Sequence, residues 1–353
     1  MVVLVLTLLA AACGQNGDQV QVGETQAQGE QQPGRVLQTV QERGTLNCGV
    51  NDSVPGFGFV DEEGNFSGFD IDFCRVIAAA VLGDAEAVSF TPLTAQQRFT
   101  ALQTGEIDVL VRNTTWTATR DGSEGGAFAV TTYYDGQGMM VRADSPAQTL
   151  EDLDGATVCV LSGTTTELNL ETNFAARGLD YTPASFEDNE TLQQAFEQGQ
   201  CDAWTSDKSQ LAGVRSDWPE GPEALRILDV TMSKEPLGPA VRDGDPDWFD
   251  AVNWAMIATM QAEEFGIDST NVDQRRDQAD DPDVRNFLGD LDAGLGLPSD
   301  FAYQVVSQVG NYGEIYERNV GSEGIGLERC PSPEACLNEL WNEGGLHYPP
   351  PYR

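Results

Sequence analysis

The sequence predicts an α/β protein made of two lobes, each built around a β-sheet of parallel strands. The length of 353 residues suits two domains of ordinary size. Both halves show the order strand, helix, strand, helix, strand, which is typical of a parallel sheet covered by helices. Residues 101–108 (ALQTGEID) and 195–202 (AFEQGQCD) share Ala, Gly and Asp at the same spacing. This echo indicates that the two halves follow one plan, unless it is a coincidence between two short segments.

In the first half, the alternation and the helical period of the apolar residues define the elements. We expect strands at 45–51, 88–93 and 107–111, and helices at 69–82 and 94–104. Gly83 and Gly105 follow the two helices directly, as glycine commonly does where a helix ends. In open parallel sheets, ligands bind beyond the carboxyl ends of the strands. The polar segments just after the strands are therefore the places to search for a site.

The second half begins with a strand at 157–161 (TVCVL) and reaches its last strand at 201–205. Thr164 and Glu167 have the spacing of a capping box, which predicts that a helix starts there. Free backbone amides and the helix dipole would make this start, together with Gly163, an anion site. Ordinary capping explains the same residues equally well without a ligand.

The N-terminal segment predicts export. Residues 2–12 (VVLVLTLLAAA) are too short to span a bilayer as a helix but have the length of a signal-peptide core, so we assign 1–12 as a signal peptide. Small residues directly before Cys13 resemble a lipobox, the signal for lipidating that cysteine in bacterial lipoproteins. The alternative is a plain signal peptide that happens to contain a cysteine. Residues 13–38 are Gln-rich with few large apolar side chains, so we expect a tether there.

The charge of the chain excludes several classes of function. The sequence has 57 acidic and 19 basic residues, a net charge of −38, so we expect no binding to nucleic acid or to anionic membrane surfaces. One histidine, His347, makes Ser/His catalysis and His-based metal sites poor hypotheses, and we expect neither a metal nor a cofactor. We interpret the acidity as an adaptation to a salty exterior, where carboxylates keep the surface hydrated.

Six cysteines besides Cys13 predict disulfides, because disulfides persist in exported proteins. Sequence alone permits 15 pairings of six cysteines. Their order along the chain favours pairs that each close a short loop within one region: Cys48 with Cys74, Cys159 with Cys201, and Cys330 with Cys336. Metal binding is the alternative, but none of these cysteines has a C-x-x-C spacing or a histidine beside it.

The segment after the 107–111 strand carries candidate anion ligands. Arg120 can hold a carboxylate through two parallel hydrogen bonds, and Asn113 and Thr115 add further donors. The alternative is that Arg120 forms an ion pair on the surface of this very acidic protein.

Two candidates follow the strands of the second half. Thr165 and Thr166 lie at the helix start described above, and Asp207 follows the last strand. Asp207 could bind an ammonium group, or it could merely cap the next helix. Donors for a carboxylate and one carboxylate, converging between two lobes, are the complement of a zwitterion such as an α-amino acid.

Long segments of the chain resemble the general L-amino acid-binding proteins of polar amino-acid ABC transporters. The resemblance covers about residues 39–353 and rests on GTLNCGVN (44–51), GFDIDFC (68–74), RFTALQTGEIDVLVRNTTWTATRD (98–121), TYYDGQGMMV (132–141), SGTTTELNL (162–170), SKEPLGPAVR (233–242), WFDAVNWAMIA (248–258), VGNYGEIYERN (309–319) and GGLHYPPPYR (344–353).

The resemblance implies the type II periplasmic-binding-protein fold, two α/β lobes joined by two crossing segments near 132–141 and 232–241. It divides the folded chain into 39–135 in the first lobe, 136–235 in the second, and 236–353 as a return to the first lobe with a C-terminal extension. The helix that starts at Asp245, Pro246 and Trp248 would pack on the first lobe.

The resemblance also implies roles for individual residues. Asn113, Thr115, Arg120, Thr165 and Thr166 would bind the α-carboxylate, and Asp207 would bind the α-ammonium group. Candidates for the side-chain pocket are Asn51, Asp52, Phe57, Arg98 and Arg112.

The implied function is capture of L-amino acids with broad specificity and delivery to the permease subunits of an ABC transporter. The protein would be a monomer, attached to a membrane only through its lipid anchor, on the outer face of the cytoplasmic membrane or in the periplasm. One alternative is an enzyme on the same fold, such as a dehydratase, although no pair of carboxylates for proton transfer is evident. A ligand-sensing module is the other alternative, although no signalling domain follows before Arg353.

Overall fold

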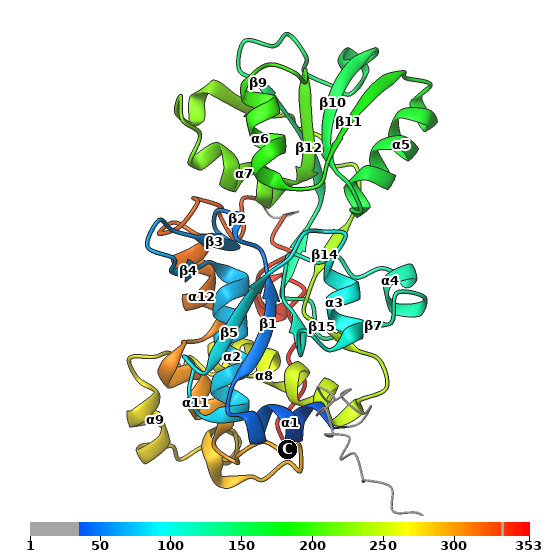
Figure 1. The fold of residues 1–353 in the computed structure, drawn as a ribbon. Coiled ribbons are helices and arrows are strands. Elements are labelled where there is room, and N and C mark those ends of the chain that lie inside the picture. Colours follow the sequence, from blue (N-terminus) through cyan, green and yellow to red (C-terminus); the bar gives the residue numbers. More distant parts are fainter. Residues whose placement is uncertain (1–34, 333–334) are drawn as a thin grey trace, which may run out of the picture. The chain divides into compact units, whose positions relative to one another are not determined.

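The structure is a computed structural model that describes residues 35–332 and 335–353. The expected signal peptide, the lipidation site Cys13 and the Gln-rich segment as far as residue 34 lie outside the described residues. Helix α1 (Val36–Arg43) begins within the last residues of the segment that the sequence assigns to the tether. The remainder folds into two α/β lobes, so the predicted architecture is confirmed (Figure 1).

The sheet of the first lobe has the order β5-β1-β6-β15-β7. Its strands are β1 (Leu46–Val50), β5 (Val88–Pro92), β6 (Val109–Leu110), β7 (Gly126–Phe128) and β15 (Ala240–Arg242). The first three are parallel, but β15 runs antiparallel to both β6 and β7. The three strands that the sequence predicted are parallel, as expected, and the additional strand β15 makes the sheet mixed. The physical reason is that β15 is the chain returning from the second lobe, so it enters the sheet from the opposite end.

Helices of the first lobe bury the largest apolar cluster of the described residues. They are α2 (Phe69–Leu82), α8 (Pro246–Glu264), α9 (Val272–Gln278), α10 (Pro282–Arg285), α11 (Phe301–Gln308) and α12 (Tyr312–Asn319). Helix α3 (Arg98–Thr104) packs in a smaller cluster of the same lobe, and the short helix α4 (Ala118–Gly122) follows it in the chain. Helix α2 has the predicted bounds and ends at Gly83, which takes the left-handed conformation (φ 72°). Helix α8 begins where predicted, with the Asp245 carboxylate accepting a hydrogen bond from the Trp248 amide at 3.1 Å.

Helix α3 begins later than predicted, because residues 94–97 form a turn instead. The Thr94 amide donates to Gln97 Oε1 at 3.2 Å, and the Gln97 amide donates to Thr94 Oγ1 at 3.3 Å. This reciprocal pair has the capping-box pattern of a Thr and a Gln three residues apart, which favours a helix start. Residues 95–97 form a turn that leads into the regular helix, which begins at Arg98.

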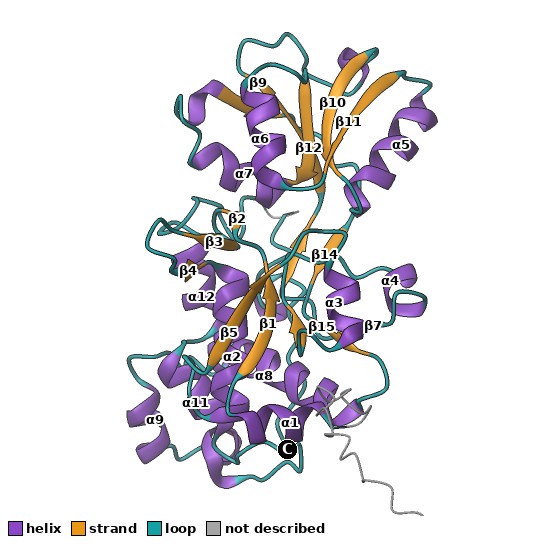
Figure 2. Cartoon of the chain, viewed as in Figure 1, coloured by secondary structure: helices purple, strands orange, loops and turns teal. Residues whose placement is uncertain are grey.

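The second lobe has a sheet of order β11-β10-β12-β9-β13. Its strands are β9 (Gln137–Arg142), β10 (Ala156–Leu161), β11 (Tyr181–Phe186), β12 (Ala203–Asp207) and β13 (Leu225–Ile227), and its helices are α5 (Thr165–Arg177), α6 (Asn189–Glu197) and α7 (Lys208–Ser216). β10, β11 and β12 are parallel, while β9 is antiparallel to β12 and β13 is antiparallel to β9. This sheet is mixed as well, and Figure 2 shows its strands with helices α5, α6 and α7 beside them. Two separate apolar clusters pack against the sheet.

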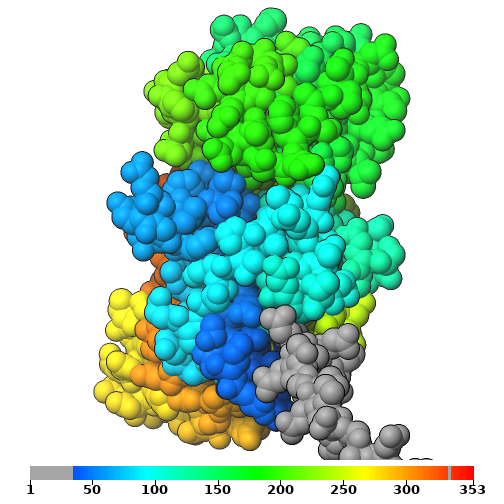
Figure 3. All heavy atoms as spheres, in the orientation of Figure 1, coloured from blue at the N-terminus to red at the C-terminus, as the bar shows by residue number. Residues whose placement is uncertain are grey.

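Two short strands join the lobes. β8 (Tyr133–Asp135) and β14 (Glu235–Leu237) pair in antiparallel orientation within the two segments expected to cross between the lobes. A small sheet of β2 (Ser53–Val54), β3 (Gly58–Val60) and β4 (Phe66–Ser67) lies beside the second lobe, and Figure 3 shows these atoms meeting the green atoms of that lobe. Single helical turns lie at Glu151–Leu153, Pro222–Ala224, Asn286–Asp290 and Trp341–Glu343.

Three disulfides join the cysteines in the predicted pairs, Cys48–Cys74, Cys159–Cys201 and Cys330–Cys336. The first links β1 to α2, the second links β10 to a residue two positions before β12, and the third joins two residues of the C-terminal extension. Each therefore lies within one lobe or within the extension, as expected for pairs close together in sequence.

Candidate functional site

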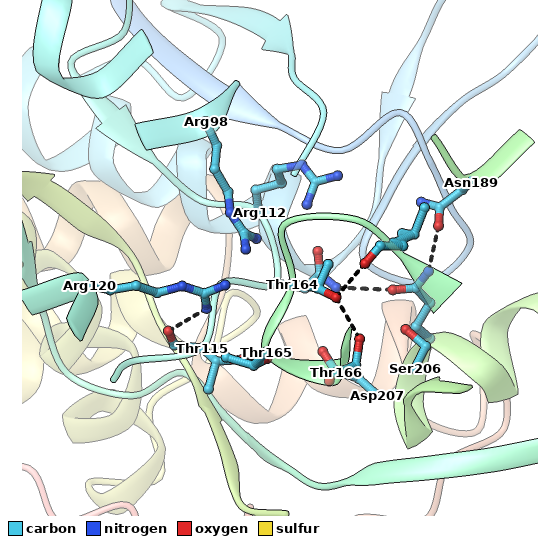
Figure 4. A pocket seen from close by; sticks show the side chains of 13 residues that line it. Arg98, Arg112, Thr115, Arg120, Thr164, Thr165, Thr166, Asn189, Ser206 and Asp207 are labelled. Carbon is cyan, nitrogen blue, oxygen red and sulfur yellow. Dashed lines mark hydrogen bonds between the residues drawn. The ribbon is translucent and has the colours of Figure 1, made fainter. Parts of the chain in front are cut away.

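A small cavity lies between the strand ends of the two lobes. It is lined by Arg98, Arg112, Asn113, Thr115 and Arg120 of the first lobe and by Leu161, Thr164, Thr165, Thr166, Asn189, Ser206, Asp207 and Gln210 of the second. Its volume is about 20 Å³, room for about one water molecule. An organic ligand can therefore enter only when the lobes move apart. Eight of the eleven candidate ligand-binding residues line this cavity. Figure 4 shows how the labelled ones face one another.

Asn113 turns the chain into the cavity directly after β6. It has a positive φ of 31°, a conformation that asparagine tolerates better than most residues. The backbone N–H of Asn113 donates to Asp70 Oδ2 at 2.6 Å, and its side-chain Oδ1 accepts from Asn51 Nδ2 at 2.6 Å. Burial raises the pKa of Asp70 to about 7. The side-chain amide of Asn113 is thus fixed from the first lobe and faces the second.

Arg120 is buried, contrary to the alternative of a surface ion pair. Its backbone amide donates to the capping residue Thr117 of α4, and its Nη1 donates to the Thr115 carbonyl at 2.7 Å. Its guanidinium lies 5.6 Å from the centre of the Phe99 ring. The exposed fraction of Arg120 is 5%. In the part of the chain that the structure describes, no carboxylate lies within ion-pair distance of it.

Arg98 and Arg112 place two further buried positive charges beside the cavity. Arg98 Nη1 contacts Thr114 Oγ1 at 3.5 Å and its Nε has no partner, while Arg112 Nε donates to the Leu93 carbonyl at 2.6 Å. Neither has an ion pair among the described residues, and Figure 4 shows Arg98 and Arg112 beside each other on the side of the cavity opposite the lining threonines. Burial, followed by repulsion from Arg120 and Arg112, lowers the pKa of Arg98, and burial lowers the pKa of Arg112 to about 10.

The start of α5 forms the opposite wall. Thr164 caps the helix by accepting from the Glu167 amide at 3.1 Å, so the predicted helix start is confirmed. Glu167 Oε2 accepts from the Gly163 amide at 3.0 Å, one residue earlier than in a standard capping box. As first-turn residues, Thr165 and Thr166 have backbone amides without an intrahelical acceptor. Across the cavity, Thr165 Oγ1 lies 3.4 Å from Thr115 Oγ1 of the first lobe.

Asp207 ends β12 inside the cavity and does not cap α7, because its side chain makes no capping hydrogen bond. Only 5% of its surface is exposed, and its Oδ1 has no hydrogen-bond partner. Burial raises the pKa of Asp207 well above its usual range, and the nearby carboxyls Asp135 and Glu235 raise it further. A cationic group beside Asp207 would relieve both effects.

A chain of side-chain amides crosses between the lobes and was missed by the sequence reasoning. Asn113 Nδ2 donates to Gln210 Oε1 at 3.3 Å, and Gln210 Nε2 donates to Asn189 Oδ1 at 2.7 Å. Asn189 Nδ2 reaches Ser53 Oγ in the first lobe at 3.5 Å. Asn189 begins α6 and Gln210 lies in the first turn of α7, so both follow strand ends, where the same search rule could have found them.

The candidates for the side-chain pocket lie in three different environments. Arg98 and Arg112 line the cavity, as described. Asn51 and Asp52 line a neighbouring space of about 140 Å³ that shares Arg112 and Asn189 with it. Phe57 lines neither space: it is 1% exposed and packs on Phe69 and Tyr133, with ring centroids 5.7 and 5.2 Å apart, in the first-lobe core. An aromatic side chain in this turn-rich loop was more favourably buried than exposed to a polar cavity.

The described parts of the chain hold neither a candidate metal cluster nor a helix that could span a membrane. Neither described range contains a cluster of three or more His, Cys, Asp or Glu side chains that could hold a metal ion. None of the described helices has the length and apolarity that crossing a membrane requires.

Comparison with known proteins gives consistent results. The family model described as bacterial extracellular solute-binding proteins, family 3, matches residues 46–266. The general L-amino acid-binding periplasmic protein AapJ of Rhizobium johnstonii is 48% identical over 322 residues, 90% of this chain and 92% of AapJ. The glutamate/glutamine/aspartate/asparagine-binding protein BztA of Rhodobacter capsulatus is 45% identical over 321 residues, 90% of this chain and 93% of BztA.

A solved structure shows the same fold over most of the chain. It is described as an ABC transporter/periplasmic binding protein from Brucella ovis with glutathione bound. The two chains are 45% identical and superpose with a TM-score of 0.85, which covers 90% of this chain and 99% of the other.

Proposed function

Because the chain belongs to the bacterial extracellular solute-binding proteins of family 3, we propose that it captures amino acids between its lobes and delivers them to an ABC permease. The predicted type II periplasmic-binding-protein fold is confirmed by the two lobes, the two connecting strands and the similarity to the Brucella ovis protein. The observation that carries the proposal is the charge pattern of the cavity. Three buried arginines and one buried aspartate face it, and among the described residues none of the four has an ion-pair partner.

The charges common to all α-amino acids match two of these residues. Arg120 would bind the α-carboxylate, with further donors from Asn113, Thr115 and the first-turn amides of Thr165 and Thr166. In the same complex, Asp207 would bind the α-ammonium group, which supplies the missing partner of its Oδ1. The distance between the two walls is already short enough for a hydroxyl contact across the cavity, so both walls can reach one small ligand.

The remaining two arginines favour an acidic or amide side chain on the ligand. Once Arg120 and Asp207 are paired, Arg98 and Arg112 still lack a full counter-charge. Asp52 and Asp70 both attract Arg112, but neither lies within ion-pair distance of it, and burial raises the pKa of Asp70 to about 7, so Asp70 is only partly ionised near neutral pH. We therefore propose that glutamate and aspartate bind more tightly than their amides, and both more tightly than apolar amino acids, which narrows the broad specificity expected from the sequence. The similarity to BztA, a glutamate/glutamine/aspartate/asparagine-binding protein, supports placing acidic amino acids and their amides above apolar amino acids.

Capture and closure are linked by these charges. Buried ions without partners are costly, so the closed form is favoured when a zwitterion meets both signs of charge. A ligand shifts the equilibrium only by the difference between its affinities for the open and closed forms. Closure would then present both lobes together to the permease, whereas the unliganded protein would remain mostly open.

Isothermal titration with the twenty amino acids tests the proposal directly. We expect Arg120→Ala to weaken amino-acid binding by a factor of about 100 or more, the loss typical of removing one partner of a buried charge pair. Arg177→Ala is the matched control, because Arg177 lies at the exposed end of α5 and pairs with Glu151 on the surface at 3.5 Å. Equal affinities of wild type and Arg120→Ala, with both proteins folded, would refute the assigned role.

The proposed preference for an acidic ligand side chain is tested by comparing L-glutamate with L-glutamine. Arg98→Met should reduce affinity for L-glutamate by a factor of about 10 or more, and affinity for L-glutamine much less. An equal reduction for both ligands would show that Arg98 acts on the shared part of the ligand rather than on its side-chain carboxylate.

We propose binding without chemical conversion, since the cavity groups are hydrogen-bond donors with one carboxylate placed for an ammonium group. Incubation with each bound amino acid, followed by mass spectrometry, should return the ligand unchanged. A new product would favour the enzymatic alternative.

For localisation we propose export, lipid attachment at Cys13 and function as a monomer outside the cytoplasm. The support is the apolar run before Cys13 in the sequence and the extracellular family. Cell fractionation should find the protein in the membrane fraction, and Cys13→Ser should move it to the soluble fraction. Analytical ultracentrifugation tests the monomer.

A further inference from the structure

The first of the two connecting strands, β8, is held at Tyr134 by a side chain from the C-terminal extension, which we define as residues 327–353. The Tyr134 amide donates to Asn338 Oδ1 at 2.7 Å, and Asn338 Nδ2 donates to the Tyr134 carbonyl at 3.0 Å. Asn338 thus occupies both backbone groups of one strand residue, as a neighbouring strand would. Only 7% of its surface is exposed.

The partner strand β14 cannot form both of these backbone hydrogen bonds to Tyr134. Tyr134 lies opposite Pro236, which has no N–H to donate. The Pro236 carbonyl already accepts from the Trp116 amide at 2.8 Å. Asn338 therefore satisfies backbone groups that the two-stranded ribbon leaves open, and replacing it leaves buried polar groups without partners.

Asn338 is itself tied to the first lobe. Its carbonyl accepts from Arg329 Nε at 2.8 Å, and Arg329 forms a two-pronged ion pair with Glu263 of α8, at 2.5 and 3.0 Å. Both partners of that pair are largely buried, so it is fixed more firmly than a surface ion pair. Hydrogen bonds and an ion pair therefore connect Tyr134 to α8 through Asn338 and Arg329.

A second path reaches the residue just before β8. The Tyr312 hydroxyl, at the start of α12, donates to the Thr132 carbonyl at 2.9 Å, and His347 Nε2 lies 2.9 Å from the same hydroxyl. The His347 ring also packs on the ring of Tyr134, with centroids 5.3 Å apart. The Tyr133 side chain, between these two points, is buried in the first-lobe core.

From Asp135 onward, the first connecting strand is hydrogen-bonded to the second lobe instead of the first. Asp135 Oδ2 accepts from the Ser209 amide at 3.2 Å, and the Gly136 carbonyl accepts from the Lys208 amide at 2.9 Å. Both donors belong to the first turn of α7. A Cβ at Gly136 would lie 2.6 Å from Thr231 Cγ2 of the segment leading to the other connecting strand, so glycine permits a close approach of the two connections here.

We propose that Asn338 and His347 are positioning residues that hold the first connecting strand to the first lobe as far as Tyr134, so that the lobes rotate about Tyr134–Gly136. A fixed pivot restricts the open form and lowers the entropy lost on closure. Neither residue lines the ligand cavity. The extension thereby contributes to ligand affinity from outside the site, a consequence that rests on the proposed function, whereas the position of the pivot does not.

Asn338→Leu tests the proposal, because leucine is similar in size and makes neither hydrogen bond. Hydrogen exchange of the peptide that contains Tyr134 should become at least about 10-fold faster, since its amide loses its acceptor. The distribution of inter-lobe distances, measured with spin labels on exposed sites of each lobe, should broaden toward open forms. The affinity for L-glutamate should fall by a factor of about 5 to 20, within the usual range of coupling between distant sites.

Asn338→Asp keeps an acceptor for the Tyr134 amide and loses the donor, so its exchange rate should lie between those of wild type and Asn338→Leu. If the leucine variant does not fold, Asn338→Asp alone tests the proposal. Leu337→Ala is the control, because Leu337 is the exposed neighbour of Asn338. Unchanged exchange and unchanged distances in both Asn338 variants would overturn the proposal. If wild type fails to bind L-glutamate, the proposed ligand class falls, while exchange and distance still decide the pivot.

Discussion

His347 should make the protein lose stability in mild acid, and the size of the loss can be worked out from its surroundings. The ring is 1% exposed, its Nε2 lies 2.9 Å from the Tyr312 hydroxyl, and its Nδ1 has no partner. Burial, with a smaller effect from the positive charge of Arg329, lowers the pKa of His347 from 6.5 to about 3. The folded protein therefore holds a neutral imidazole over a pH range in which the unfolded chain binds a proton.

The sign and magnitude follow from proton linkage. Because the folded pKa is the lower one, the stabilisation is complete above about pH 6.5 and is lost as the pH falls toward 3. Between about pH 7.5 and about pH 4.5 the loss from this single group is about 3 kcal/mol. Asp135 acts in the opposite direction, since burial raises its pKa to about 6 and folding then favours its protonated form. The total pH dependence of the wild type therefore mixes both signs.

A matched variant isolates the histidine. His347→Gln keeps a polar side chain that can contact Tyr312 but cannot be protonated in this range. Urea unfolding of both proteins at several pH values and constant ionic strength gives two stability curves. The stability of the wild type relative to the variant should fall by about 3 kcal/mol from about pH 7.5 to about pH 4.5. Since the sequence has one histidine, a difference independent of pH would refute the reasoning, and a titration of its ring by NMR would show the actual pKa.

Three further expectations concern stability. Replacing Cys159 and Cys201 together by serine should destabilise the second lobe by about 4 kcal/mol, because their disulfide closes a loop with a sequence separation of 42; urea unfolding checks this. Thr164→Ala should cost about 1 kcal/mol by removing the cap of α5, whereas Thr172→Ala on the exposed face of the same helix should cost little, as thermal unfolding would show. Raising the NaCl concentration from about 20 to about 500 mM should increase the melting temperature by a few degrees, because the net charge is −38; an unchanged or lower value would contradict a role for surface repulsion.

Local signals determined which elements could be predicted from the sequence. Helix α2 was predicted residue by residue because a clear helical period ends at Gly83. The strand directions could not be derived in this way, since the antiparallel placement of β15 depends on a chain that leaves for the second lobe and returns. The start of α3 was predicted four residues early, because the apolar pattern does not distinguish the capped turn at 94–97 from the regular helix that follows it.

The residues of the candidate site that directly follow a strand could be predicted from the sequence. The side-chain contacts that form only between the two lobes could not. Inspecting the segments after strands identified Arg120 and Asp207, because a charged side chain at a strand end is visible in the sequence. Gln210 carries no charge that would draw attention to it, and glutamine is common in this sequence. Its partner Asn113 lies 97 residues away in the chain. Phe57 shows the opposite error, because proximity to a strand end in sequence placed it at the cavity although it lies in the core.

The extreme acidity and the basic cavity act over different distances, which explains how they coexist. Charges on the surface are screened within a Debye length of about 8 Å at physiological salt. The guanidinium groups of Arg98, Arg112 and Arg120 are desolvated, so their attraction for an anion is screened much less. A carboxylate ligand would therefore be weakly repelled by the protein as a whole and strongly attracted once it reached the cavity. In a salty exterior the repulsion disappears while the attraction remains, so high surface acidity and capture of acidic amino acids are compatible in one protein.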